Sequence, residues 1–173
     1  MHTHAMDLLI RPVAPTEHDE LGAITAQAYL QDNLLDFGDS DPYQHVLRDV
    51  AARAACAEVL AALRDGRVLG GVTFVPSGGP MADLAGPGEA EIRMLAVSRA
   101  ARGQGVGEAL VRSCLDRART TPGCRSVVLS TQRTMHTAHR IYERLGFTRT
   151  PRRDWNPVPE LTDITLLTYE LTL

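Results

Sequence analysis

Three glycines separated by single residues form the motif with the clearest chemical meaning in this sequence. Gly103, Gly105 and Gly107 follow Arg102 and lead directly into a segment whose apolar residues recur with helical spacing. The start of a helix exposes unpaired backbone N–H groups and the positive end of the helix dipole, and glycine lets a ligand approach them closely. The motif therefore predicts a phosphate-binding turn, in which several N–H groups and the Arg102 guanidinium supply most of the affinity.

The spacing of these glycines argues against a dinucleotide-binding fold. A G-x-G-x-x-G fingerprint that starts at Gly103 needs glycine at position 108, where the chain has Glu108. The sequence instead fits R-x-x-G-x-G, filled by Arg102, Gly105 and Gly107. Binding of a nicotinamide or flavin dinucleotide is therefore not expected.

Hydrophobic patterning predicts the elements that must hold this turn. The helix after the glycines carries Val106, Leu110, Cys114 and Ala118 on one face, and Asp65-Gly66 favours a hairpin turn. Strands are predicted at 7–13, 58–63, 67–74, 89–97, 126–131 and 164–171, and helices at 17–30, 44–56, 106–120 and 134–145. Hairpin-paired strands come first and strands alternating with helices come later, which predicts one α/β domain over residues 1–173, with a mixed central β-sheet flanked by helices.

The composition of the chain excludes several classes of enzyme. All 18 basic residues are arginine, and lysine is absent. P-loop ATPases, protein kinases and pyridoxal-phosphate enzymes each need a lysine, so these three classes are excluded. The three cysteines are scattered and form no CxxC pair, and His136 and His139 share a helix without a third ligand in view. We therefore predict neither disulfides nor a metal.

The net charge of −3 hides an uneven distribution of charge. Residues 93–153 carry 13 arginines against three acidic residues, whereas residues 1–92 carry five arginines against 14 acidic residues. These arginines are irregularly spaced and have few aromatic neighbours, which favours a compact polyanion over nucleic acid as the partner. No apolar run is long enough to span a bilayer and the start of the sequence has no export signal, so a cytoplasmic protein with no membrane partner is expected.

At the glycine motif the chain resembles the GNAT (GCN5-related) N-acetyltransferase superfamily, whose members use acyl-coenzyme A. The stretch TMHTAHRIYERLGF, at 134–147, is similar to a second motif of that family, a helix that ends in tyrosine, a charged pair and Leu-Gly-Phe. The two motifs span about residues 89–149 and occur in the expected order, separated by a strand. The resemblance implies a GNAT-like fold, acetyl-CoA as co-substrate, no metal, and transfer of an acetyl group to an amine.

The same resemblance assigns cofactor contacts position by position. Backbone groups of the strand would pair with the pantetheine arm, and the turn would hold the pyrophosphate. The residues concerned are Leu95, Ala96 and Val97 for the arm, and Arg102, Gly103, Gln104, Gly105, Val106 and Gly107 for the phosphates. The strand 89–97 would splay from the strand 126–131, with the thioester in the gap. One position departs from the family, because Met135 stands where asparagine often precedes the helix alanine Ala138.

N-acylation needs a neutral amine and a proton for the leaving thiolate. At pH 7 deprotonation costs about 4.6 kcal/mol for a lysine-type amine and about 1 kcal/mol for an α-amine. By its position Glu91 resembles the glutamate base of histone-acetylating family members, and it is the first candidate for the general base. Glu89, on the same strand face, is the second candidate, and a water molecule is the third. Tyr142 would be the general acid; because full proton transfer to the sulfur is uphill by about 2 kcal/mol, hydrogen bonding would be most of its contribution. The non-catalytic alternatives are that Glu91 or Glu89 is only a solvated carboxylate at the strand edge, and that Tyr142 only packs in the core.

The acceptor is less well specified than the cofactor. Aspartates at 32, 36, 39 and 41 lie in the loop 31–42, which has an apolar anchor, and this loop and the Pro/Gly-rich, mobile loop 76–88 border the acceptor side in the family. Acidic loops favour a cationic primary amine, either a small molecule such as a polyamine or aminoglycoside or a protein N-terminus, although such loops often serve solubility alone. Asp154 and Trp155 are further candidates for this side. A non-catalytic acyl-CoA sensor, transfer of a longer acyl chain, and a homodimer all stay open.

Overall fold

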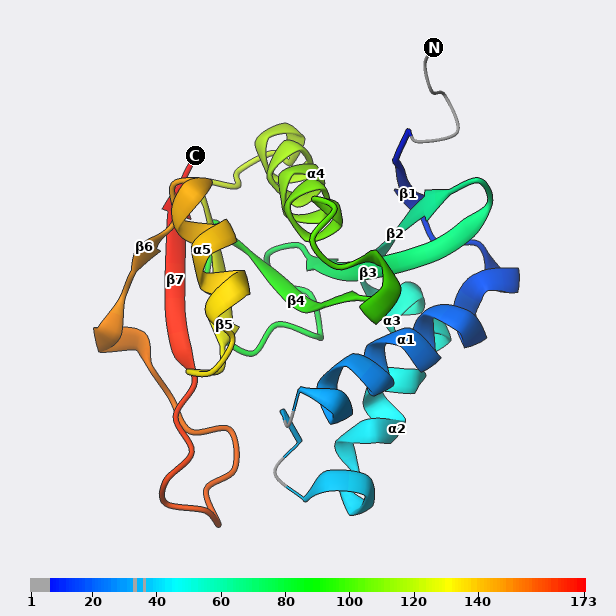
Figure 1. Ribbon diagram of the computed structural model, residues 1–173. Coiled ribbons are helices and arrows are strands. Elements are labelled where there is room, and N and C mark those ends of the chain that lie inside the picture. The colour runs from blue at the N-terminus through cyan, green and yellow to red at the C-terminus, as the bar shows by residue number, and fades with distance from the viewer. Residues whose placement is uncertain (1–6, 33, 36) are drawn as a thin grey trace.

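A computed structural model describes residues 7–32, 34–35 and 37–173 of the chain (Figure 1). Seven strands form one sheet, with helices on both of its faces. The strands are β1 (Leu9–Pro12), β2 (Glu58–Arg64), β3 (Arg67–Val75), β4 (Glu89–Val97), β5 (Ser126–Thr131), β6 (Thr148–Arg149) and β7 (Leu167–Thr172). The α-helices are α1 (His18–Gln31), α2 (Tyr43–Arg48), α3 (Val50–Cys56), α4 (Val106–Thr120) and α5 (His136–Arg144). Short 3-10 turns are η2 (Pro15–Glu17), η3 (Gly38–Ser40), η4 (Arg99–Ala101) and η5 (Pro151–Arg153).

The strand order of the sheet is β1-β2-β3-β4-β5-β7-β6. Every neighbouring pair is antiparallel except β4 and β5, which are parallel. Helix α4 lies across one face of the sheet, whereas α1 and α2 lie on the opposite side (Figure 1). The predicted apolar face of α4 is fully buried in the main core, where Leu110, Cys114 and Ala118 have no exposed surface. The mixed α/β sheet predicted from the sequence is confirmed.

A β-bulge interrupts β4 just before the predicted cofactor-binding residues. The register with β3 shifts between Gly71 and Thr73, and Met94 adopts a φ of +56°. The bulge reverses the alternation of side chains along the strand. Ile92 before it and Leu95 after it both pack on the α4 side, although they are three residues apart. Met94 packs on the other side, against residues of α1 and α2.

The sheet divides into two halves beyond the middle of β4. The parallel pairing of β4 with β5 covers four positions, from Glu89 with Ser126 to Ile92 with Leu129. After Leu129, β5 continues to pair with β7 as far as Thr131, but no described strand pairs with β4 on that side. The predicted gap between the two strands is therefore confirmed.

Several predicted elements differ in detail from those observed. The helix predicted at 44–56 is two helices, because the Asp49 side chain accepts a hydrogen bond from the Ala52 N–H and starts α3 as its N-cap. The last strand begins at Leu167 rather than 164, and α5 begins at His136 rather than 134. The two-residue strand β6 was not predicted, since a segment this short carries no periodic pattern.

Candidate active site

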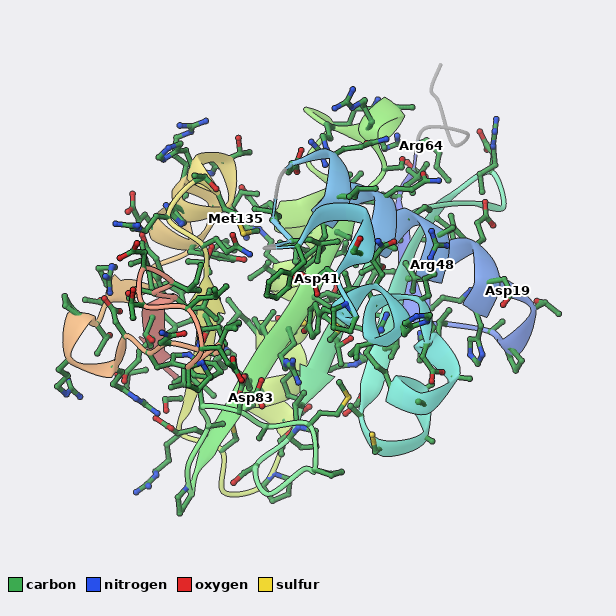
Figure 2. The ribbon with its side chains drawn as sticks, turned by 90° about the horizontal axis from the view of Figure 1, so that it is seen from below. Asp19, Asp41, Arg48, Arg64, Asp83 and Met135 are labelled. Atoms are coloured by element: carbon green, nitrogen blue, oxygen red, sulfur yellow. The ribbon has the colours of Figure 1, made fainter. Side chains whose placement is uncertain are left out.

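A cavity of about 780 Å³ lies where the two halves of the sheet separate. Its walls come from α1, α2, the bulged part of β4, the end of β5, the start of α5 and the segment before β7. Figure 2, which looks at the molecule from below, shows three of the lining residues, Asp41, Asp83 and Met135, coming from three separate segments. Glu91 and Tyr142, the predicted base and acid, both line this cavity, although Glu91 comes from β4 and Tyr142 from α5.

The turn before α4 has the geometry of an anion-binding site. Gly103 and Gly105 have φ values of +78° and +79°, a left-handed conformation that favours glycine. A Cβ at either position would meet nothing within 4 Å, so the turn is open on that side. The first backbone N–H of this region with a partner is that of Ala109, bonded to the Gly105 carbonyl. Among the described residues, the six N–H groups of residues 103–108 donate to no protein atom, and they are therefore available to phosphate oxygens.

The Arg102 side chain is engaged elsewhere in the molecule. Its guanidinium makes a two-pronged ion pair with Asp32 at the end of α1, with N–O distances of 3.0 and 2.9 Å. Both side chains are more than one third exposed, so the pair is weak. Gln104 accepts a hydrogen bond from Arg64 and donates one to the Ala100 carbonyl. A phosphate ligand would therefore find free donors in the backbone N–H groups of residues 103–108, whereas the side chains of Arg102 and Gln104 already have partners within the protein.

The other predicted cofactor residues fall into two groups. Leu95, Ala96 and Val97 follow the bulge; Ala96 and Val97 pair with β3 on one side, and their other edge faces the gap. Val106 is buried in the core, so only its backbone can serve a ligand. Gly107 has a packing role, because a Cβ there would come within 3.3 Å of Ile141 on α5.

Glu91 is buried, with 1% of its surface exposed. One carboxylate oxygen, Oε1, accepts hydrogen bonds from three consecutive backbone N–H groups, those of Asp83, Leu84 and Ala85. The other oxygen, Oε2, has no hydrogen bond from any described residue, and Glu91 lines the cavity. Burial raises the pKa of Glu91 above its ordinary value, while the backbone N–H groups and Arg93 oppose this shift. The loop 76–88, expected to be mobile, is held in place by this carboxylate.

Glu89, the reserve candidate for the base, has a structural role. Both of its oxygens accept hydrogen bonds from Arg153, and one also accepts from the Gly86 N–H. The hydrogen bonds from Arg153 hold the pKa of Glu89 below its ordinary value. Glu89 does not line the cavity. These contacts favour Glu91 over Glu89 as the group that could accept a proton from a ligand.

Tyr142 projects from α5 into the interior, with 3% of its surface exposed. Its ring packs against Phe147 and Tyr169, with centroid separations of 5.7 and 5.8 Å. Burial raises the pKa of the phenol further above its usual value, so the hydroxyl stays protonated at neutral pH. No described residue hydrogen-bonds this hydroxyl, and Tyr142 lines the cavity at its β5–α5 end. The arrangement suits a hydrogen-bond donor to a ligand atom.

Several lining residues were not predicted from the sequence. Arg93 donates to the Met81 carbonyl and to the Tyr43 hydroxyl, and its guanidinium pairs with Asp83. Ser130, on β5, accepts a hydrogen bond from the indole N–H of Trp155. Tyr29 also lines the cavity, from α1. Alternation along β4 puts Arg93 on the same face as Glu91 and could have indicated it, whereas Ser130 and Tyr29 are brought in by tertiary packing alone.

The predicted acidic loop contributes less to the cavity than its composition suggests. Asp32 binds Arg102, and both oxygens of Asp41 accept backbone N–H groups of their own loop, those of Phe37 and Tyr43. Position 36 and the side chain at position 39 lie outside the described part of the structure. Asp154 pairs with Arg149 and lies outside the cavity lining, whereas Trp155 lines the cavity. Of the four aspartates, only Asp41 is a described lining residue.

The described residues include no group of three or more His, Cys, Asp or Glu side chains arranged to hold a metal ion. His136 and His139 lie close together, but the His139 ring nitrogen bonds the Gln132 carbonyl. No helix in the described part of the chain has the length and apolar character needed to cross a membrane.

Comparison with known proteins gives a consistent result. The model of the acetyltransferase (GNAT) family matches residues 24–147. One similar solved structure is a GCN5-related N-acetyltransferase from Kribbella flavida, with 20% sequence identity, a TM-score of 0.71, and coverage of 96% of this chain and 98% of that chain. Another is yncA, a putative acetyltransferase from Salmonella typhimurium with its cofactor acetyl-CoA, with 20% sequence identity, a TM-score of 0.70, and coverage of 95% of this chain and 93% of that chain. A ribosomal-protein-alanine N-acetyltransferase from Brucella melitensis is similar to the same degree, with 20% sequence identity, a TM-score of 0.70, and coverage of 95% of this chain and 99% of that chain. Among curated proteins no match is found.

The parallel strands β4 and β5 separate beside a turn whose N–H groups have no partner among the described residues. The family match covers most of the chain, and the protein belongs to the acetyltransferase (GNAT) family. Acetyl-CoA is the co-substrate of this family, and the residues present fit it. Six free N–H groups and two open glycines can receive its phosphates, and the gap between β4 and β5 can receive its thioester end.

Proposed function

We propose that this protein transfers the acetyl group of acetyl-CoA to a primary amine, with direct attack of the amine nitrogen on the thioester carbonyl. The observation that carries the proposal is that Glu91 and Tyr142 line one cavity at the strand gap, each with an oxygen that no described residue hydrogen-bonds. The match to the acetyltransferase family and the open N–H groups of residues 103–108 support the choice of co-substrate.

In the proposed reaction Glu91 Oε2 accepts a proton from the amine. Burial raises the pKa of Glu91, which brings the carboxylate closer to the pKa of the amine and makes it a better base than an exposed glutamate. The three N–H groups on Oε1 keep the carboxylate in position while Oε2 reacts. The nitrogen forms a bond to the acetyl carbon as the carbon–sulfur bond breaks.

Tyr142 acts on the leaving group in this proposal. Its hydroxyl donates a hydrogen bond to the departing sulfur. The thiolate then takes up one proton from solvent while Glu91 releases the proton of the amine to solvent, so the protons balance. Because burial keeps the pKa of Tyr142 high, complete transfer of the phenolic proton is unfavourable, and hydrogen bonding is its main contribution.

The test compares wild-type protein with Tyr142→Phe, which keeps the ring that packs against Phe147 and Tyr169. Acetyl-CoA binding is measured by calorimetry, and acetyl transfer to a panel of primary amines by mass spectrometry. We expect transfer to fall by about 100-fold with unchanged acetyl-CoA affinity. Acetyl-CoA binding without transfer to any amine would instead support a non-catalytic acyl-CoA sensor.

A further inference from the structure

The cavity is apolar over most of its wall and has a polar corner at Glu91. Further polar lining residues are Asp41, Ser130, Thr131, Gln132 and Glu160. The polar corner contains Glu91, Asp83 and Arg93, with the Tyr43 hydroxyl bonded to Arg93. The rest of the wall is mainly aromatic and aliphatic. Phe37, Val46, Trp155, Pro157, Val158 and Ile164 belong to this part. An amphipathic cavity of this kind matches a ligand with an amino group at one end and an apolar body at the other.

Two apolar lining residues are unusually exposed. Phe37 is 52% exposed and Val46 is 43% exposed; the other exposed large hydrophobic side chains in the described part of the chain are Leu9, at 55%, and Leu173, at 37%. Both side chains border the cavity, one from the loop before η3 and one from α2. Exposed apolar surface at a cavity indicates a site for an apolar ligand group, since burying that surface is favourable.

Apart from Glu160, which is exposed, most polar side chains of the wall already have hydrogen-bond partners within the protein. Asp41 binds two backbone N–H groups, and Arg93 binds a carbonyl, a hydroxyl and Asp83. The Trp155 indole donates to Ser130, and Gln132 donates to the Leu34 carbonyl at 2.6 Å. A ligand with many hydroxyl or ammonium groups, such as an aminoglycoside or polyamine, would lose hydration here and gain few hydrogen bonds in return.

From these observations we infer that the acceptor is a primary amine carried by an aromatic or bulky aliphatic body, with the amino group at Glu91 and the body against the wall that Phe37 and Val46 extend to the surface. This inference rests on the proposed function and narrows it to one acceptor class. It narrows the expectation of a cationic primary amine, which was based on the aspartates of the loop 31–42, to amines with an apolar body.

Phenethylamine and ethylamine test the inference directly, because they present the same reacting group and differ by one phenyl ring. We expect kcat/KM for acetylation to be at least about tenfold higher for phenethylamine, and putrescine to resemble ethylamine. Binding is followed independently of turnover by the fluorescence of Trp155, the single tryptophan of the chain, which lines the cavity.

Exposed apolar residues supply matched variants. Phe37→Ser and Val46→Ser should each reduce the preference for phenethylamine several-fold. Leu9→Ser, at a residue on β1 that is 55% exposed and outside the cavity lining, should leave the preference unchanged. Because all three side chains are exposed, none of these changes removes core packing.

The outcomes separate this inference from the proposed function. Equal rates for the two amines, a preference for putrescine, or acetyl-CoA binding without acetylation of phenethylamine would overturn the acceptor class. Absence of acetyl-CoA binding would overturn the proposed function. In that case the ranking of amines by Trp155 fluorescence still tests the cavity, and equal binding of phenethylamine and ethylamine would reject the inference.

Discussion

The two ends of the candidate active site are built in different ways. The proposed cofactor end would use backbone groups from one continuous segment, from Leu95 at the end of β4 to Glu108 in the first turn of α4. The acceptor end uses side chains from α1, α2, β4, β5, α5 and the segment before β7, which are far apart in the sequence. A backbone site needs only local geometry, whereas a side-chain site needs the whole fold. In this proposal, recognition of the co-substrate depends on the local conformation of one segment, whereas selection of the acceptor depends on the tertiary packing of several segments.

Glu91→Gln should have the largest effect, and it should affect the acceptor end alone. The glutamine oxygen can still accept the N–H bonds of Asp83, Leu84 and Ala85, so the loop should keep its conformation. Without a base, kcat should fall by about 100-fold or more while acetyl-CoA affinity stays the same. Glu20→Gln, at an exposed position of α1, is the control for loss of a carboxylate.

The pH dependence of Glu91→Gln gives a second measure. The base is active when deprotonated, so wild-type kcat/KM should rise as pH increases through the pKa of Glu91, which burial places above the ordinary value of about 4.3. The glutamine variant should lack the step at the pKa of Glu91 and keep only the rise caused by deprotonation of the amine itself, whose pKa is about 10. A retained step with unchanged kcat would show that Glu91 only anchors the loop and that water serves as the base.

Gly105→Glu should have the next largest effect, at the cofactor end. A side chain at this left-handed position would place a negative charge beside the N–H groups of residues 103–108, and acetyl-CoA affinity should fall by about 100-fold in calorimetric titration. Gly123→Glu is closely matched, because Gly123 also has a φ of +79° and no neighbour within 4 Å, but it lies beyond the other end of α4. Equal losses in both variants would point to backbone strain rather than phosphate binding.

Gln132→Leu should have a smaller effect, confined to the acceptor end. The change removes the hydrogen bond from the end of β5 to the Leu34 carbonyl, a contact between the two sides of the cavity. We expect the acceptor KM to rise by up to about tenfold with unchanged acetyl-CoA affinity, since a buried carbonyl loses its partner. Gln27→Leu, at an exposed position of α1, is the control. A loss of acetyl-CoA affinity would contradict the separation of the two ends.

Asp32→Asn should have the smallest effect, and it should increase acetyl-CoA affinity rather than decrease it. Removing the carboxylate frees Arg102 for the phosphates, so acetyl-CoA affinity should increase by about two- to fivefold, as expected for loss of an exposed ion pair. Asp116→Asn, which breaks an exposed pair with Arg119 on α4, is the matched control. Unchanged affinity in both variants would show that Arg102 contributes nothing to phosphate binding.

The sequence predictions were accurate for features set by local geometry and less accurate for features set by tertiary packing. The bounds of β5 and α4 are predicted to the residue, because hydrophobic periodicity and the glycine turn are local signals. The gap beside β4 was implied by the family resemblance and is confirmed. The break at Asp49 and the bulge at Met94 were missed, since each depends on one side chain or one dihedral angle rather than a pattern.

The acceptor wall was the least predictable part of the site. Aspartates in a loop predicted a cationic acceptor, which stays a prediction; in the structure Asp32 binds Arg102, and Asp41 binds backbone N–H groups. The contact between Trp155 and Ser130 joins positions 25 residues apart, and the one between Gln132 and Leu34 spans 98. Composition reports which side chains a segment has, whereas the cavity depends on which of them are already bound.

The bulge in β4 also decides which residues the strand presents on each side of it. Glu91 and Arg93 precede the bulge and share one face of the strand, whereas Ala96 and Val97 follow it and pair with β3 while their other edge faces the gap. A shift of one residue in a strand turns each affected side chain to the opposite face of the sheet. Moving the bulge past Arg93, toward the start of β4, would therefore turn the guanidinium away from Asp83 and Tyr43, so the position of a single backbone irregularity decides which side chains of β4 line the cavity.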